Sequence, residues 1–96
     1  MSETVLERMY VIPLRGAYEA SRTRRAKRAI NIIREFAQRH MKGEEVRISD
    51  GVNKLVWSRG AEKPPRRIKV LIRRDESGVI HVMLPDEAGE VEEGKE

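Results

Sequence analysis

The chain has 96 residues, of which 39% are hydrophobic and 38% charged, and it has no cysteine. This length suits one domain with a small core, and the lack of cysteine excludes disulfides, thiol catalysis and cysteine-ligated metal. No apolar segment approaches the ~20 residues of a membrane-spanning helix. No apolar run follows the polar N-terminus either, so we expect neither a membrane span nor a signal peptide.

Charge is distributed unevenly along the chain. Residues 85–96 carry six acids and one base, whereas residues 1–84 carry 19 basic and 10 acidic side chains. A domain this small with a net charge of +9 favours a polyanionic partner. The acidic run has little apolar surface to bury. We therefore expect a single folded domain over residues 1–84, followed by an acidic, disordered tail.

Segments in which successive side chains alternate between two sides, with a period of two residues, are predicted to be strands. Pro13 has no N–H to donate, so the first strand lies at an edge or ends there. Asp75-Glu76-Ser77-Gly78 has the composition of a turn, and the strands on either side of it should form a hairpin. In the first of these two strands, we expect Leu71 to face outward. The segments with this pattern are residues 5–14, 44–49, 66–74 and 79–84.

A long amphipathic helix should follow a loop at residues 15–20. Ser21 or Thr23 could cap its N-terminus, and Gly43 should end it. Apolar residues at helical spacing define its buried stripe. The stripe contains Ala26, Ala29, Ile30, Ile33, Phe36, Ala37 and Met41.

A second, shorter helix should begin at Ser49 or Asp50 and end before Gly60. Its Trp57 has two interpretations: it fills the small core, which we favour, or it presents its ring to a nucleotide base beside Arg59. The resulting order is β-α-β-α-β-β. This order predicts an α+β, two-layer fold, with a small mixed sheet, one long helix and one short helix.

Few residues could carry catalysis. His40 and His81 are the only histidines, and neither has a second histidine or a carboxylate at metal-ligand spacing. Asp75 and Glu76 adjoin in a turn, where carboxylates are usually solvated. There is no glycine-rich phosphate loop, nucleophile elbow or dinucleotide fingerprint. We therefore expect structural histidines and no catalytic, cofactor-binding or metal-binding residue.

Clusters of basic residues favour binding of phosphate. Five cations fall within residues 21–28, at the start of the long helix, where the helix dipole and unpaired N–H groups prefer acids. Such an N-terminus indicates an external anion, and both N–H groups and guanidinium groups suit phosphate. A second cluster surrounds Pro64 and Pro65. The candidate RNA-binding residues are Arg8, Arg15, Arg22, Arg24, Arg25, Lys27, Arg28, Arg59, Lys63, Arg66 and Arg67.

We expect a third basic cluster, Lys69, Arg73 and Arg74, to face outward from a strand. The alternative for all three clusters is that they only solubilise the domain, and this alternative weighs most for the third. No aromatic pair of the RNA-recognition-motif type is present, and no Asn or Gln flanks the helix arginines. These absences favour recognition of nucleic-acid backbone and shape rather than of base sequence.

Four sequence segments occur in a characteristic order: ERMYVIPLR at 7–15, RRAKRAI at 24–30, IREF at 33–36, and WSRG at 57–60 followed by KPPR at 63–66. Together they resemble the archaeal–eukaryotic type of large-subunit ribosomal protein thirty-one. The resemblance covers about Val5 to Leu84. The compact length and acidic tail indicate an archaeal member.

This resemblance implies a structural component of the large ribosomal subunit that supports translation in the cytoplasm. It implies binding to ribosomal RNA near the exit of the nascent-peptide tunnel, a mixed sheet flanked by helices, no catalytic activity and no cofactor. The implied partners are large-subunit ribosomal RNA, neighbouring ribosomal proteins and factors that act on emerging chains. We expect no small-molecule substrate, and no membrane partner because no stretch combines a basic face with a broad aromatic and leucine-rich one.

Two alternatives remain open from the residues alone. A free nucleic-acid-binding regulator or chromatin-like protein would use the same basic clusters, but it would need a dimer or a groove-reading element. A small RNA-processing enzyme would need a histidine and a carboxylate to converge on one site.

Overall fold

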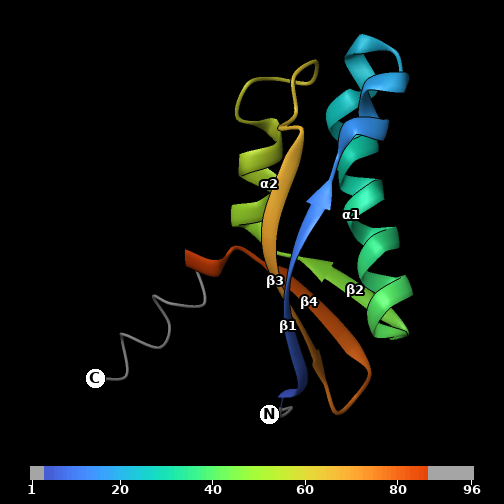
Figure 1. Ribbon diagram of the computed structural model, residues 1–96, viewed down its shortest axis with the longest axis vertical. Coiled ribbons are helices and arrows are strands. Elements are labelled where there is room, and N and C mark those ends of the chain that lie inside the picture. The colour runs from blue at the N-terminus through green and yellow to red at the C-terminus, as the bar shows by residue number, and fades with distance from the viewer. Residues whose placement is uncertain (1–3, 87–96) are drawn as a thin grey trace.

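The computed structural model describes residues 4–86, and the side chains from Leu6 onward (Figure 1). The predicted acidic tail, residues 85–96, therefore lies outside the described residues except for Pro85 and Asp86. The described part is elongated, and its elements follow the predicted order β-α-β-α-β-β, with two short 3₁₀ helices inserted after the first strand. The α+β fold class is confirmed.

The sheet is mixed and has the strand order β1-β3-β4-β2. Antiparallel pairing joins β1 to β3 and β3 to β4, whereas β2 lies parallel to β4. Pro13 is the last residue of the edge strand β1, as its missing N–H predicts. The strands are β1 (Thr4–Pro13), β2 (Glu45–Ile48), β3 (Arg67–Asp75) and β4 (Val79–Met83).

Two helices, α1 (Arg25–Met41) and α2 (Asp50–Trp57), contribute to the same buried cluster as the inward residues of the sheet. The predicted stripe of α1 is confirmed, because Ala26, Ala29, Ile33, Ala37 and Met41 are buried and Ile30 and Phe36 pack against the core. From the sheet, the cluster takes Ile12, Ile68, Val70, Ile72, Ile80 and Val82.

The short helix α2 has the predicted cap. Ser49 Oγ accepts a hydrogen bond from Val52 N at 3.2 Å, which pairs one of the free N–H groups of the first turn. Val52 and Val56, one helical turn apart, are fully buried, whereas Trp57 is 41% exposed. The preferred interpretation of Trp57 as a core residue is therefore wrong, since the inward side of α2 is occupied by the two valines.

The start of α1 differs from the prediction. Residues 15–20 are not an irregular loop, because most of them form the 3₁₀ helix η1 (Arg15–Glu19), and η2 (Arg22–Arg24) follows. The residue at the N-cap of α1 is Arg24, and no side chain makes a capping hydrogen bond there. The predicted cap by Ser21 or Thr23 is wrong, because the chain reaches α1 through backbone-bonded 3₁₀ turns instead.

Two predicted orientations on β3 also differ. Leu71 is only 5% exposed, although it lies on the outer side of the sheet. Its partners in register are Met9 on β1 and Met83 on β4, so apolar side chains of both adjacent strands flank it. Arg74 does not face outward, because its Nη1 donates to Met41 O at 2.8 Å. This contact places a cation at the C-terminal end of α1, where the helix dipole favours one.

The β3–β4 turn is organised by one carboxylate. Asp75 Oδ1 accepts from Ser77 N, Ser77 Oγ and Val79 N at 3.0, 2.6 and 3.0 Å, and Asp75 Oδ2 lies 3.1 Å from His81 Nε2. The expectation of a solvated carboxylate is wrong for Asp75, whose side chain is 12% exposed. Its pKa is lowered, first by the hydrogen bond from the Ser77 hydroxyl.

Replacing Asp75 with Asn should lower the melting temperature above about pH 4 and lose this effect at lower pH. A carboxyl with a pKa lowered by folding stabilises the protein above its unfolded pKa of ~3.9. That stabilisation disappears as pH falls through the lower folded value, because Asp75 then becomes protonated. Thermal unfolding from pH 2 to 8 checks this, because the difference in melting temperature should shrink steadily as pH falls below about 4. The control is Glu76→Gln at the exposed neighbouring position of the turn, which removes the same formal charge and should change the melting temperature much less at neutral pH.

Candidate nucleic-acid interface

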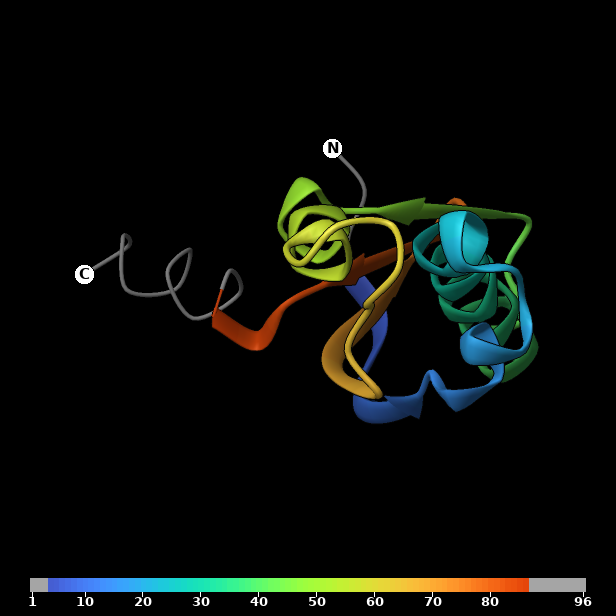
Figure 2. The same ribbon diagram turned by 90° about the horizontal axis from the view of Figure 1, so that it is seen from above.

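The fold brings two predicted basic clusters together at one end of the molecule. We call this the basic end and define it as residues 15–28 and 59–67. It contains ten basic and two acidic side chains. Figure 1 shows η1, η2 and the start of α1 beside the loop that leads from α2 to β3, and Figure 2 looks onto this end. Sequence segments about 40 residues apart therefore form one surface.

Backbone hydrogen bonds fix the two segments to each other. Leu14 N donates to Arg66 O at 2.7 Å, and Ala26 N donates to Ala61 O at 2.9 Å. The second contact ties the first turn of α1 to the loop. Because the backbone is held at both points, the cations of the basic end project from a fixed framework.

The N-terminus of α1 is less open than its sequence suggests. Arg25 N donates to Arg22 O within η2, and Ala26 N is taken by Ala61 O. We expected the N–H groups at the start of the helix to be unpaired and free to bind an external anion. For these two groups that expectation is wrong. The attraction for an anion comes from the side chains, since α1 has no acid in its first turn.

Basic side chains line shallow hollows across this end. One hollow of 440 Å³ is lined by Arg24, Lys27 and Arg28 together with Ala20 and Asn31. Another, of 310 Å³, is lined by Arg15, Arg66 and Arg67 with Pro13. Arg59 and Lys63 share a third hollow of 380 Å³ with Thr23 and Glu62. Most of the predicted RNA-binding residues therefore lie within one continuous region.

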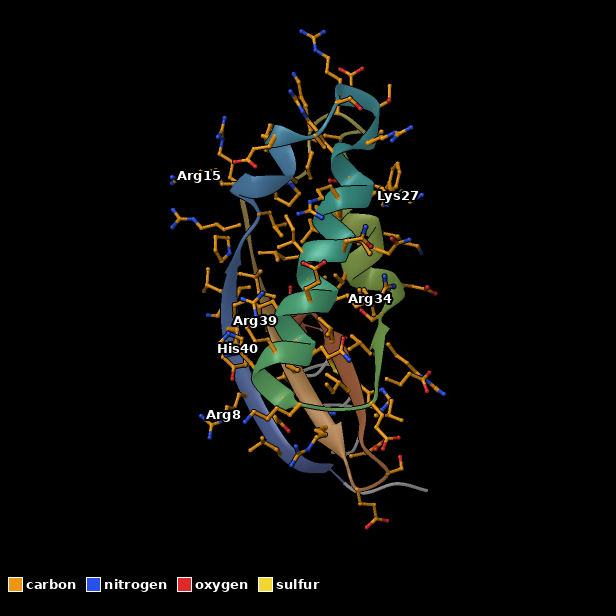
Figure 3. The ribbon with its side chains drawn as sticks, turned by 90° about the vertical axis from the view of Figure 1, so that its right-hand side faces the viewer. Arg8, Arg15, Lys27, Arg34, Arg39 and His40 are labelled. Carbon is orange, nitrogen blue, oxygen red and sulfur yellow. The ribbon has the colours of Figure 1, made fainter. Side chains whose placement is uncertain are left out.

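Three predicted residues do not line these three hollows: Arg8, Arg22 and Arg25, of which Arg25 lines a fourth hollow described below. Arg8 lies two residues before Tyr10 on the same side of β1, and Tyr10 contacts the rings of Phe36 and His40 in the last turns of α1. Figure 3 accordingly shows Arg8 near Arg39 and His40, far from Arg15 and Lys27. The expected grouping of Arg8 with the start of the helix is wrong. Arg22 is exposed on η2, at the basic end itself.

Two of the three cations in the third cluster contact other parts of the protein. Arg73 Nε pairs with Glu7 Oε1 at 3.1 Å, and Arg74 binds the end of α1 as described above. Only Lys69 remains an exposed cation of this group. The third cluster therefore does not form a phosphate-binding row.

The histidines have structural contacts on separate elements. His40 stacks on Phe36 with ring centroids 4.1 Å apart, and His81 pairs with Asp75 in the turn. Residues 4–86 hold no group of three or more potential metal-ligating side chains. Neither helix in that part of the chain has the length and apolarity to cross a bilayer.

Tyr18 is the residue that sequence reasoning missed. It lines a fourth hollow of 390 Å³ with Arg25, Arg59, Lys63 and Arg66. The available signal was an aromatic residue between Arg15 and Arg22 in a polar segment. Its neighbours across the hollow come from more than 40 residues along the chain, which no local pattern reveals.

The family profile and the most similar relatives indicate the same family. The profile of the family described as ribosomal protein L31e matches residues 4–78. A protein from Methanopyrus kandleri named large ribosomal subunit protein eL31 is 45% identical over 86 residues, which is 90% of this chain and 100% of the relative.

Two further relatives carry the same name. The protein from Methanothermobacter thermautotrophicus is 46% identical over 84% of this chain and 100% of its own length. That from Pyrobaculum arsenaticum is 46% identical over 85% of this chain and 91% of its own length. All three relatives come from archaea. The chain therefore belongs to the ribosomal protein L31e family, of the archaeal type.

Proposed function

We propose that this chain is a structural constituent of the large subunit of the cytoplasmic ribosome, which binds ribosomal RNA through the basic end and supports translation. One observation carries the proposal: ten basic side chains from two distant segments lie on a single surface that backbone hydrogen bonds hold in place. Family membership supplies the ribosomal context, and a ribosomal structural protein is not an enzyme.

The proposal assigns RNA binding to residues 1–84 and excludes the acidic segment 85–96, whose net charge of −5 repels phosphate. It includes a position near the exit of the nascent-peptide tunnel, which the sequence resemblance implies. Neighbouring ribosomal proteins and factors that act on emerging chains are the further partners that such a position would give.

Binding to archaeal large-subunit ribosomal RNA should depend steeply on salt. If about six phosphates are neutralised, the plot of log K against log salt concentration should have a slope of roughly −4 to −5, at ~0.7–0.9 per contact. A filter-binding or fluorescence titration from low to moderate salt measures this slope. A slope shallower than about −2 would be incompatible with binding through the basic end.

Sedimentation separates this proposal from a free nucleic-acid-binding regulator. The native protein should sediment with large subunits on a sucrose gradient and stay with them through a moderate salt wash. A regulator would remain near the top of the gradient or leave in that wash. Large subunits that lack the protein should take it up again stoichiometrically, whereas small subunits should not.

A further inference from the structure

Tyr18 lines the fourth hollow and is held there by two kinds of contact. Its hydroxyl donates to Pro64 O at 2.5 Å, across 46 positions of sequence. The guanidinium carbons of Arg25 and Arg66 each lie 5.0 Å from the centroid of its ring. This distance lies within the range of cation–π contacts, so one ring supports two cations from different segments.

Arg25 is restrained more closely than the other cations of the basic end. Its Nη1 donates to Glu62 O at 3.3 Å. Its Nε is buried and has no hydrogen-bond partner among the described residues. A buried donor without a partner costs free energy in the unliganded protein. The burial that isolates Nε also keeps an anion from it, so a ligand would contact the remaining nitrogens of this guanidinium, which can donate charge-assisted hydrogen bonds to phosphate.

The lining of the hollow defines the chemistry of its ligand. Arg25, Arg59, Lys63 and Arg66 contribute four cations, and no acid contributes to the lining. The remaining lining is Tyr18, Pro64 and Pro65, and the two prolines fix the backbone of the loop. A hollow that combines several guanidinium groups with a proline-restrained backbone suits a phosphate group, which accepts paired hydrogen bonds from arginine.

The surroundings favour a phosphodiester over a free phosphate. The hollow opens within the basic end, where further cations continue on both sides of it. A free phosphate would use only the central cations, whereas an RNA strand could place successive phosphates along the whole row. Continuity of charge therefore points to a polymer.

We propose that Tyr18, Arg25 and Arg66 form a pre-ordered site for one phosphate of the RNA backbone, in which Tyr18 is the positioning residue. This inference rests on the proposed function, because it names a subsite of the same RNA-binding surface. Tyr18 carries no charge itself. Its role is to hold two guanidinium groups in place before the RNA arrives, which lowers the conformational entropy lost on binding.

The decisive variant is Tyr18→Leu, which removes the ring and the hydroxyl but no charge. Its affinity for archaeal large-subunit ribosomal RNA at about 0.1 M salt should fall roughly five- to tenfold, and the salt slope should become shallower by ~0.7–0.9, the value of one contact. Tyr18→Phe keeps the ring beside both arginines, so its slope should equal that of the wild type. Arg66→Ala should make the salt slope shallower by the same amount as Tyr18→Leu does. The variant with both substitutions should have a slope only slightly shallower than that of either single variant.

Tyr18→Leu could also weaken the fold, so its melting temperature is measured in parallel. A lower melting temperature with an unchanged salt slope at a temperature where the variant is folded would mean that Tyr18 is only structural, and would overturn the inference. Full additivity of Tyr18→Leu and Arg66→Ala would overturn it as well. If the wild type itself shows no steep salt dependence, the proposed function fails instead.

A second arm uses inorganic phosphate as the probe. The Nε–H signal of Arg25, followed by nitrogen–proton correlation NMR, should shift on addition of phosphate but not of chloride at equal ionic strength. The shift should be absent in Tyr18→Leu, and RNA should produce it at far lower phosphate concentration than the free ion. If the free ion is equally effective per phosphate, the ligand is not a polymer and the inference is wrong.

Discussion

Replacing Arg24 and Arg28 together with Glu should weaken RNA binding about 30-fold or more at ~0.1 M salt, while the isolated protein becomes slightly more stable. Loss of two phosphate contacts alone reduces the salt slope by roughly 1.4–1.8, and each new carboxylate also repels the RNA. Arg24 is the N-cap residue of α1, and Arg28 lies in its first turn. Both line the same hollow.

The gain in stability has a separate physical cause. The first turn of α1 contains no acid, and four basic residues at positions 24, 25, 27 and 28 oppose the helix dipole. A carboxylate near a helix N-terminus contributes about 0.3–1 kcal/mol. Opposite changes in stability and RNA affinity are the expected signature of residues retained for binding. They are not expected if the cations only solubilise the domain.

A control with the same change in net charge separates position from total charge. Arg34 and Arg47 lie on α1 and β2, outside the basic end, and both are exposed. Arg34→Glu with Arg47→Glu should reduce RNA affinity much less than the variant at positions 24 and 28. Thermal unfolding and RNA titration are measured on both variants. If the variant at positions 24 and 28 lost stability as well as affinity, its cations would have a structural role.

Most elements of this fold could be predicted because their side-chain patterns are local. Alternation over residues 5–14 specifies which side of β1 is buried, and the apolar stripe of α1 fixes its inward face. The burial of Leu71 could not be predicted from local alternation, because it depends on β3 being a central strand. A central strand has neighbours on both sides, here Met9 and Met83, and strand order is not visible in the strand itself.

The candidate interface was predicted in composition but not in geometry. Charge counting found the cations, yet it grouped them by sequence position. Arg8 was therefore joined to a cluster that lies toward the other end of β1, and Arg74 was assigned to the surface although it binds Met41 O. The contact between Tyr18 and Pro64 spans 46 positions, so only the folded topology could reveal it.

Gly43 shows how a correct prediction can rest on the wrong cause. Its position after α1 indicated a helix stop, for which glycine usually supplies a left-handed conformation. In the structure that conformation belongs to Lys42, with φ 55° and ψ 43°. Gly43 is instead required by close approach, because a Cβ atom there would lie 2.5 Å from Ile80 Cγ1 and 2.6 Å from Gly78 O.

Replacing Gly43 with Ala should therefore lower the free energy of unfolding by about 1–3 kcal/mol, the usual cost of overpacking a core. Ile80 is fully buried and cannot turn away freely. Gly78 O is also fixed, because it accepts a hydrogen bond from Glu44 N at 3.0 Å. The clash thus involves both the core and the β3–β4 turn. Urea unfolding at neutral pH measures the loss.

Gly16→Ala is the matched control. A Cβ at Gly16 would have Ile32 Cδ1 as its nearest neighbour, at 3.6 Å, which is ordinary contact. Its unfolding free energy should stay the same or rise by ~0.4–1 kcal/mol, because alanine restricts the unfolded chain. If both variants unfolded at the same urea concentration as the wild type, close packing at Gly43 would be excluded. Since Gly43 lies between α1 and β2, away from the basic end, the folded fraction of Gly43→Ala should keep the wild-type salt slope for RNA.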